Sequence, residues 1–183
     1  ILTILYGAIA TAKTTSNTIG WDIWGAKYTT DSTTYYRIEH NRPLQTVVRA
    51  ETVGKNAFGE GYTTTSVTIY SYHDLKTAPH NVLGEIRSAF TSSTTKGWDI
   101  WGAEYTTRSM TTYVLEHNRP LQSKVTAITQ GKNLFGEYYR TVSTTDYTYK
   151  TTTDARFIDK MDDGTPILTI LYGAIATAKT TSN

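Results

Sequence analysis

The chain has 183 residues and a formal net charge of +2, with 19% charged residues and no cysteine. Its Lys and Arg residues are scattered rather than grouped into a stripe, so we expect no nucleic-acid partner. Without cysteine neither a disulfide framework nor a thiolate metal site can form, and we expect no cofactor.

Threonine supplies 37 residues and tyrosine 14, a composition that suits β-strands. No segment shows a convincing helical period. The longest apolar stretch, residues 1–12, is too short to cross a bilayer, so we expect no membrane span. The chain begins at Ile1 without a methionine, which suggests a processed product or a segment of a longer polypeptide.

Two repeats organise the sequence. Residues 167–183 are identical to residues 1–17, and a shift of 77 positions lays residues 20–62 on 97–139 with 30 of 43 residues identical. The pattern predicts a β module at 1–77, a second module at 78–166 with a longer acidic linker at 154–166, and a copy of the first strand at 167–183. Neither module is large enough for a substantial core, so we expect them to pack together.

The segment that opens the chain is apolar on both faces of a strand, which favours a buried position. Its copy at the end of the chain predicts that this strand joins units end to end, as the start of the next repeat or as a strand donated to another copy. The residues assigned to this assembly strand are Ile1, Leu2, Ile4, Leu5, Tyr6 and Ile9, with Ile167, Leu168, Ile170, Leu171, Tyr172 and Ile175 in the copy.

The motif WDIWG occurs once in each module and contributes Trp21 and Trp24, then Trp98 and Trp101. Residues three apart lie on opposite faces of a regular strand, so one tryptophan of each pair is expected to anchor the core. The alternative is that the other tryptophan, beside a carboxylate, forms a platform for stacking a sugar ring.

The motif EHNRPLQ is also identical in both modules. The motif is typical of a turn whose polar side chains form hydrogen bonds with each other or with the backbone, and in which proline fixes φ. The alternative is a loop that presents paired polar contacts to a carbohydrate; the residues concerned are Glu39, His40, Asn41 and Arg42, with Glu116, His117, Asn118 and Arg119. No nucleophile motif accompanies the Glu-His pair, and both modules carry it, so we expect no enzyme.

When the two modules are aligned, identical and different residues alternate with a period of two. From residue 62 to 73 every even position matches its partner 77 residues later, and every odd position differs. Only a β-strand sorts side chains in this way, so one face is constant between modules and the other is variable. Two variable positions reverse charge together, Lys27 to Glu104 and Asp31 to Arg108, and could form ion pairs that fix the register between modules.

These patterns predict about five strands in each module: 3–13, 21–29, 33–39, 44–53 and 61–73, then 80–90, 98–106, 110–116, 121–130 and 138–150. The expected fold is all-β, with two homologous antiparallel sandwich-like or barrel-like modules in tandem.

Three carboxylates in the acidic linker, Asp159, Asp162 and Asp163, make a weak candidate for calcium, but their spacing matches no EF-hand loop, so the sequence favours a solvated linker. The overall prediction is a secreted structural repeat protein that binds copies of itself, head to tail, in a fibre, sheath or adhesive filament. The alternatives are a two-site carbohydrate-binding module and a β-rich pore-forming or surface toxin.

Overall fold

The computed structural model describes residues 9–21, 23–74, 84–116, 118–149 and 175–183, together with the backbone of two short strands at 158–160 and 166–168. Every regular element within these residues is a β-strand. In this part of the chain there is no helix with the length and apolar character needed to cross a membrane.

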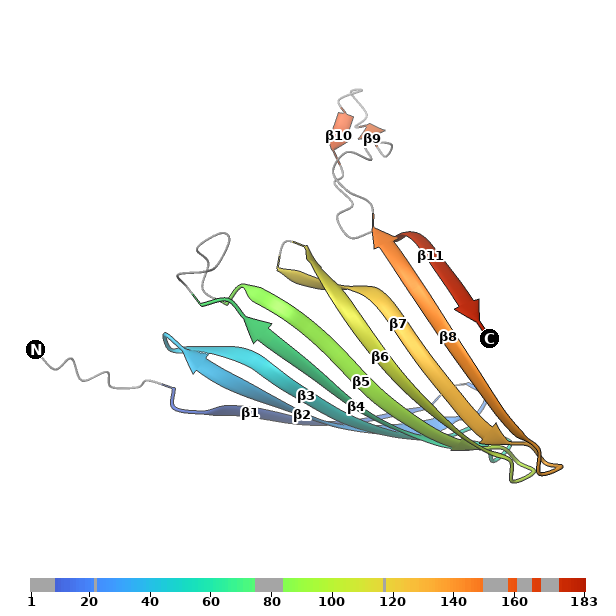
Figure 1. The fold of residues 1–183 in the computed structure, drawn as a ribbon. Coiled ribbons are helices and arrows are strands. Elements are labelled where there is room, and N and C mark those ends of the chain that lie inside the picture. Colours follow the sequence, from blue (N-terminus) through green and yellow to red (C-terminus); the bar gives the residue numbers. More distant parts are fainter. Residues whose placement is uncertain are drawn as a thin grey trace, which may run out of the picture.

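Nine strands form one antiparallel sheet whose spatial order follows the chain (Figure 1). They are β1 (Ala12–Trp21), β2 (Lys27–Glu39), β3 (Arg42–Lys55), β4 (Gly61–Tyr72), β5 (Ile86–Trp98), β6 (Glu104–Glu116), β7 (Arg119–Lys132), β8 (Tyr138–Tyr149) and β11 (Ile175–Ser182). Two more, β9 (Ile158–Lys160) and β10 (Pro166–Leu168), pair only with each other. In Figure 1 the strand direction turns steadily from β1 to β11, which is the normal twist of a sheet.

Both modules contribute to the same sheet. β4 of the first module pairs with β5 of the second from Gly61 opposite Trp98 to Tyr72 opposite Ile86. Each module supplies four strands of 10 to 14 residues instead of five shorter ones. The described residues therefore do not confirm two sandwich-like or barrel-like modules, because the sheet is a single layer whose edges are not joined. The predicted module boundary between residues 77 and 78 lies outside the described residues.

The sheet has almost no apolar core of its own. Among the residues with described side chains, the buried apolar ones are Leu44 and Ala89, at 8% and 6% exposure. Large apolar side chains such as Trp21 and Ile23 stay exposed. Since burial of apolar surface is normally the main favourable term in folding, contacts between neighbouring strands carry an unusual share of the stability here.

The face that is constant between modules consists of rows of like residues that run across the sheet. The first row alternates glycine and tyrosine: Gly20, Tyr28, Gly54, Tyr62, Gly97, Tyr105, Gly131 and Tyr139. The second row is threonine throughout: Thr18, Thr30, Thr52, Thr64, Thr95, Thr107, Thr129 and Thr141. The third row contains only serine and alanine: Ser16, Ser32, Ala50, Ser66, Ser93, Ser109, Ala127, Ser143 and Ser182.

Hydroxyl groups within these rows bond in pairs across neighbouring strands. The Oγ1 atoms of Thr64 and Thr95 are 2.9 Å apart, and those of Thr107 and Thr129 are 2.8 Å apart. In the serine row the Oγ atoms of Ser93 and Ser109 are 2.7 Å apart. Each such bond contributes about 0.5–1.5 kcal/mol, so the rows fix the register as well as the spacing of the strands.

The variable face carries the longer and charged side chains. The residues that reverse charge between modules lie on β2 and β6, which are separated by three other strands. Lys27 therefore does not face Glu104 within one chain, and Asp31 does not face Arg108. The hypothesis that these residues form ion pairs fails inside a single molecule because the modules lie edge to edge.

β11 extends the sheet in the same way that β5 extends the first module. Ser182 lies opposite Ser143 on β8, and the equivalent residues Ser93 and Ser66 lie opposite each other on β5 and β4. Both pairs of strands have a register shift at the same place, between Ile175 and Thr177 on β11 and between Ser71 and Tyr72 on β4. The end of the chain thus occupies the position of the first strand of another repeat.

We predict that Gly97→Ala destabilises the sheet by about 1 kcal/mol. A Cβ atom at this position would lie 2.3 Å from Cζ of Tyr105, so the ring would have to move. In a Tyr105→Ala background the same substitution should be neutral or stabilising, because alanine suits a strand better than glycine. Urea unfolding of the four proteins of this cycle measures the coupling, and equal costs in both backgrounds would contradict the packing of the ring over the glycine.

Candidate functional sites at the two ends of the sheet

Four hairpin loops gather at one end of the sheet, at the lower right of Figure 1. They join β1 to β2, β3 to β4, β5 to β6 and β7 to β8. We call this end of the strands the loop end, and the opposite end of the strands the turn end. The sequences WDIWGA and KNAFGE in these loops look unrelated, yet they form the same structure.

Three of the loops are organised by an Asn or Asp at the first position, while the first residue of the loop between β1 and β2 lies outside the described residues. The Oδ1 atom of Asp99 accepts hydrogen bonds from the backbone N–H groups of Trp101 and Ala103, at 2.9 and 2.8 Å. Asn56 and Asn133 bond the equivalent N–H groups of their own loops at 2.9 to 3.0 Å. Three residues after each of these lies a glycine with φ between +84° and +98°, a conformation that residues with a Cβ rarely adopt.

The residue at the fifth position depends on whether the first is Asn or Asp. In the Asn loops the side-chain amide donates a hydrogen bond to a glutamate, from Asn56 to Glu60 at 2.5 Å and from Asn133 to Glu137 at 2.6 Å. Aspartate has no such donor, and the loop of Asp99 carries Ala103 at this position. Both loop types therefore hold the same two backbone N–H groups, but only the Asn loops add a hydrogen bond to a glutamate.

The third position of every loop is a large aromatic residue that stays exposed. The exposed fractions are 77% for Trp24, 82% for Phe58, 67% for Trp101 and 86% for Phe135. The prediction that one tryptophan of each WDIWG pair anchors a core is wrong, because Trp21, at 74% exposure, ends a strand and Trp24 lies at the tip of a loop. Trp98 is more covered, at 42%, and lies against Gly61.

The loops show that the smallest repeat is one β-hairpin. Each hairpin has a glycine, the loop just described, a tyrosine, and then Thr, Ser and Thr at alternate positions, as in residues 54–68 and 131–145. Comparing the chain with itself at a shift of 34 residues would have found this repeat, since Gly20 then meets Gly54 and Tyr28 meets Tyr62. Sequence analysis missed it because the shift of 77 residues gives far higher identity.

At the turn end the EHNRPLQ motif forms a tight hairpin turn. Glu39 lies opposite Arg42, and the two residues between them, His40 and Asn41, have φ values of 49° and 62°. Positive φ at both central residues is typical of a type I′ turn, whose twist matches that of the strands. In the second module Glu116 pairs with Arg119 and Asn118 has a φ of 61°, while His117 lies outside the described residues.

The asparagine of each turn also holds the start of a neighbouring segment. The Oδ1 atom of Asn41 accepts a hydrogen bond from the N–H group of Ile9 at 2.6 Å, and Asn118 does the same for Ile86 at 2.7 Å. These bonds explain why asparagine is found at both positions. Glu39 pairs with Arg37, not with Arg42, with Oε2 and Nη2 3.0 Å apart.

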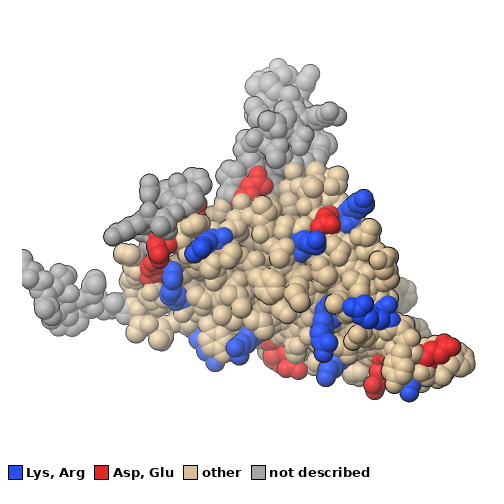
Figure 2. All heavy atoms as spheres, viewed as in Figure 1, with Lys and Arg blue, Asp and Glu red and all other residues tan. Residues whose placement is uncertain are grey.

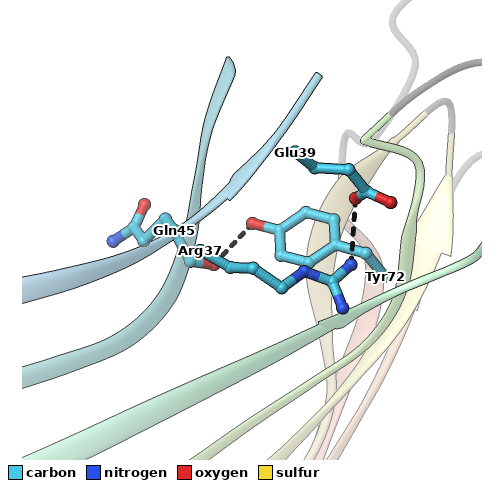
Figure 3. Close-up of polar contacts among 4 residues, drawn as sticks. All are labelled: Arg37, Glu39, Gln45 and Tyr72. Carbon is cyan, nitrogen blue, oxygen red and sulfur yellow. Dashed lines mark hydrogen bonds and ion pairs between the residues drawn. The ribbon is translucent and has the colours of Figure 1, made fainter. Parts of the chain in front are cut away.

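A second contact at the turn end joins strands β3 and β4 (Figure 3). The hydroxyl group of Tyr72 donates a hydrogen bond to the backbone oxygen of Gln45 at 2.5 Å, and Tyr149 bonds Gln122 equivalently at 2.6 Å. Burial, and next the neighbouring Tyr70, raise the pKa of Tyr72, while Arg37 lowers it by a smaller amount. The protonated phenol is therefore the form that the folded state favours.

The remaining predicted residues are only partly described. Of the assembly strand, Ile1, Leu2, Ile4, Leu5, Tyr6, Ile170, Leu171 and Tyr172 lie outside the described residues. Ile167 and Leu168 belong to β10, and the exposed Ile175 begins β11. The pairing with β8 that the structure describes thus involves the Thr-rich half of the repeated segment rather than its apolar half.

Within the described residues no group of three or more His, Asp or Glu side chains is placed to hold a metal ion. Of the calcium candidates, Asp159 is described only as backbone in β9, and Asp162 and Asp163 lie outside the described residues. Comparison with protein families, with curated proteins and with solved structures finds no match.

We expect Asp99→Ala to destabilise the chain by about 1–2 kcal/mol, because it leaves two N–H groups of the loop without their acceptor. Asp99→Asn is the matched control, since asparagine holds the equivalent loops at positions 56 and 133. It should change stability by less than about 0.5 kcal/mol. Urea unfolding compares the three proteins, and equal losses for alanine and asparagine would show that the hydrogen bonds to the Oδ1 atom do not account for the stability of the loop.

Tyr72→Phe should make stability less sensitive to alkaline pH. Because the folded state raises the pKa of Tyr72, its contribution is complete below pH 10, where the unfolded phenol is protonated, and is lost as the pH rises through the folded pKa. The variant lacks this term and should lose less stability above pH 10, although it is weaker at pH 7 by about 1 kcal/mol. Urea unfolding from pH 7 to 11 provides the comparison, and parallel curves for the two proteins would refute the prediction.

Proposed function

We propose that the chain is a unit of a non-catalytic, extracellular structural protein in which successive repeats continue one antiparallel sheet into a fibre or sheath. The observation that carries the proposal is the register of β11 on β8, which reproduces that of β5 on β4, including the irregularity at its start. The ninth strand is placed as the first strand of the next repeat would be. A sheet built in this way has no natural end.

The pairing favours growth along the sheet. Val142 on β8 exchanges both backbone hydrogen bonds with Asn183, at 2.9 and 3.0 Å. Residues 9–16 are identical to residues 175–182, so β1 of a second copy would make the same contacts on β8 as β11 does. Repeats can therefore be joined by the chain itself or by exchange of this strand between copies, and the partner is another copy in either case.

The uncovered faces of the sheet give a further reason for assembly. A single layer with two buried apolar residues among those described leaves its aromatic side chains in water. A second sheet laid against one face would cover them and give a two-layer sandwich of whole sheets, in place of the sandwich within each module that the sequence predicts. The two modules would then act as one structural unit of eight strands.

The test is a longer chain in which residues 18–183 are repeated after Asn183. If the sheet continues, it gains eight strands, and small-angle X-ray scattering should show a longest dimension increased by up to about 38 Å. Thr144→Pro at the junction should abolish the increase: Thr144 lies opposite Thr181, and by alternation from Val142 its N–H group points toward β11.

Thr144→Ala is the control for this substitution and should behave like the unmodified long chain. If the unmodified long chain scatters as two independent units on a flexible connection, the proposal fails. Electron microscopy of native material should in addition show regular filaments.

A two-site carbohydrate-binding module is the second candidate. It is favoured by Trp24 and Trp101, which present large exposed rings at equivalent loop tips, as sugar-stacking residues do. On this proposal Trp24→Ala and Trp101→Ala should each remove one of two equivalent sites from binding curves with an immobilised glycan. Unchanged curves for both variants would exclude the loop tips as sugar sites.

A further inference from the structure

A groove lies on the variable face near the loop end of strands β4 to β8. It has a volume of about 1040 Å³, and its walls include Lys96, Arg108, Lys132 and Arg140 together with one carboxylate, Glu104. Figure 2 shows basic side chains gathered over the loop end of the sheet, with acidic ones beside them. The groove therefore carries a surplus of positive charge on a chain whose total is only +2.

This charge belongs to the second module alone. The residues of the first module that correspond to Lys96, Arg108 and Arg140 are Ile19, Asp31 and Thr63. Only Lys132 has a basic counterpart, Lys55. The variable face has thus diverged into a basic groove in one module, while the constant face, which pairs the strands, has stayed the same.

Within the described part of the chain, three of these cations have no partner of opposite charge. Among the described residues, Lys96, Arg108 and Arg140 take part in no ion pair. The side chains of all three are exposed, so each keeps its charge in contact with water and is accessible to a ligand.

Aromatic side chains flank the same groove. Trp98 on β5 and Tyr138 on β8 belong to one cross-strand row, with Glu104 and Lys132 between them. Tyr138 is 84% exposed, and the Nζ atom of Lys132 lies 5.6 Å from the centre of its ring. Three strand spacings separate the two aromatic residues, about 14 Å, which gives space for a short stretch of a polymer chain.

We propose that this groove binds an acidic polysaccharide, one that carries carboxylate or sulfate groups. The cations would hold the acidic groups, and Trp98 and Tyr138 would contact the apolar faces of sugar rings. Glu104 would accept hydrogen bonds from sugar hydroxyl groups. This inference rests on charged and aromatic residues of the second module and does not depend on the array or on the paired loop tips.

The carboxylate distinguishes this ligand from a nucleic acid. A negative charge among four cations opposes any polyanion, but the cost is greatest for a phosphate backbone, whose affinity comes mainly from neutralising charge. A ligand that offers hydroxyl donors as well as anionic groups uses both kinds of side chain. The mixture of charges, with aromatic residues at both ends, therefore favours an acidic sugar polymer.

Binding of the 183-residue chain to polygalacturonate and to dextran sulfate can be measured by calorimetry, with neutral dextran and double-stranded DNA alongside. We expect binding to at least one acidic polysaccharide that weakens as salt is added, and little binding to neutral dextran or DNA. The double variant Lys96→Gln/Arg140→Gln should bind at least tenfold more weakly. The control Lys27→Gln/Lys55→Gln, which removes two lysines from β2 and β3 of the first module, should leave binding unchanged.

Glu104→Gln separates sugar recognition from attraction between opposite charges. Loss of the carboxylate should weaken binding of the acidic polysaccharide several-fold, because the amide of glutamine accepts hydrogen bonds from sugar hydroxyl groups less strongly than the carboxylate does. Stronger binding would overturn the proposal, since it would show a surface that recognises charge only. Equal or tighter binding of DNA through the same residues, or no binding of either acidic polymer, would overturn it as well; neither result bears on growth of the sheet.

Discussion

The structure depends on a fixed register between neighbouring strands, held by rows of small side chains on one face. A single-layer sheet with so little buried apolar surface has few other means of choosing one pairing. A slip by one residue would replace hydroxyl pairs such as Thr107 and Thr129 with longer side chains from the other face. The alternation of glycine and tyrosine adds a second restraint, because a ring such as that of Tyr105 fits only where its neighbour lacks a Cβ atom.

This constraint explains how the repeats vary. Residues that pair strands or close hairpins recur in both modules: the hydroxyl rows, the first residue and the glycine of each loop, and the asparagine of each turn. Residues on the other face have diverged, from Asp31 to Arg108 for example, although Asp31 accepts a hydrogen bond from Asn17 on β1. The proposed groove of the second module is one product of that freedom, so a structural repeat and a binding surface can share the same strands.

Much of the architecture could be predicted from a comparison of the modules. The period of two predicted β-strands and separated a constant face from a variable face. The identity of residues 1–17 and 167–183 indicated that the end of the chain repeats its first strand. The candidate sites were harder to predict. Trp24 and Phe58 occupy the same loop position, but their surrounding sequences differ because Asp and Asn satisfy the loop with different partners.

The sequence by itself determined that the chain is all-β and which residues share a face, because these properties depend on neighbours along the chain. It did not determine where every hairpin closes, since residues 99–103 form a loop inside the predicted strand 98–106 and β2 continues through the predicted break at residues 30–32. Only the tertiary structure decided that the modules share one open sheet, that the tryptophans of WDIWG lie near hairpin loops rather than in a core, and that the final strand lies on β8. Those outcomes depend on which strands meet edge to edge. The hydrogen bonds that join them are made by the backbone, which is the same in every residue but proline, so the side-chain pattern alone leaves the choice of partner open.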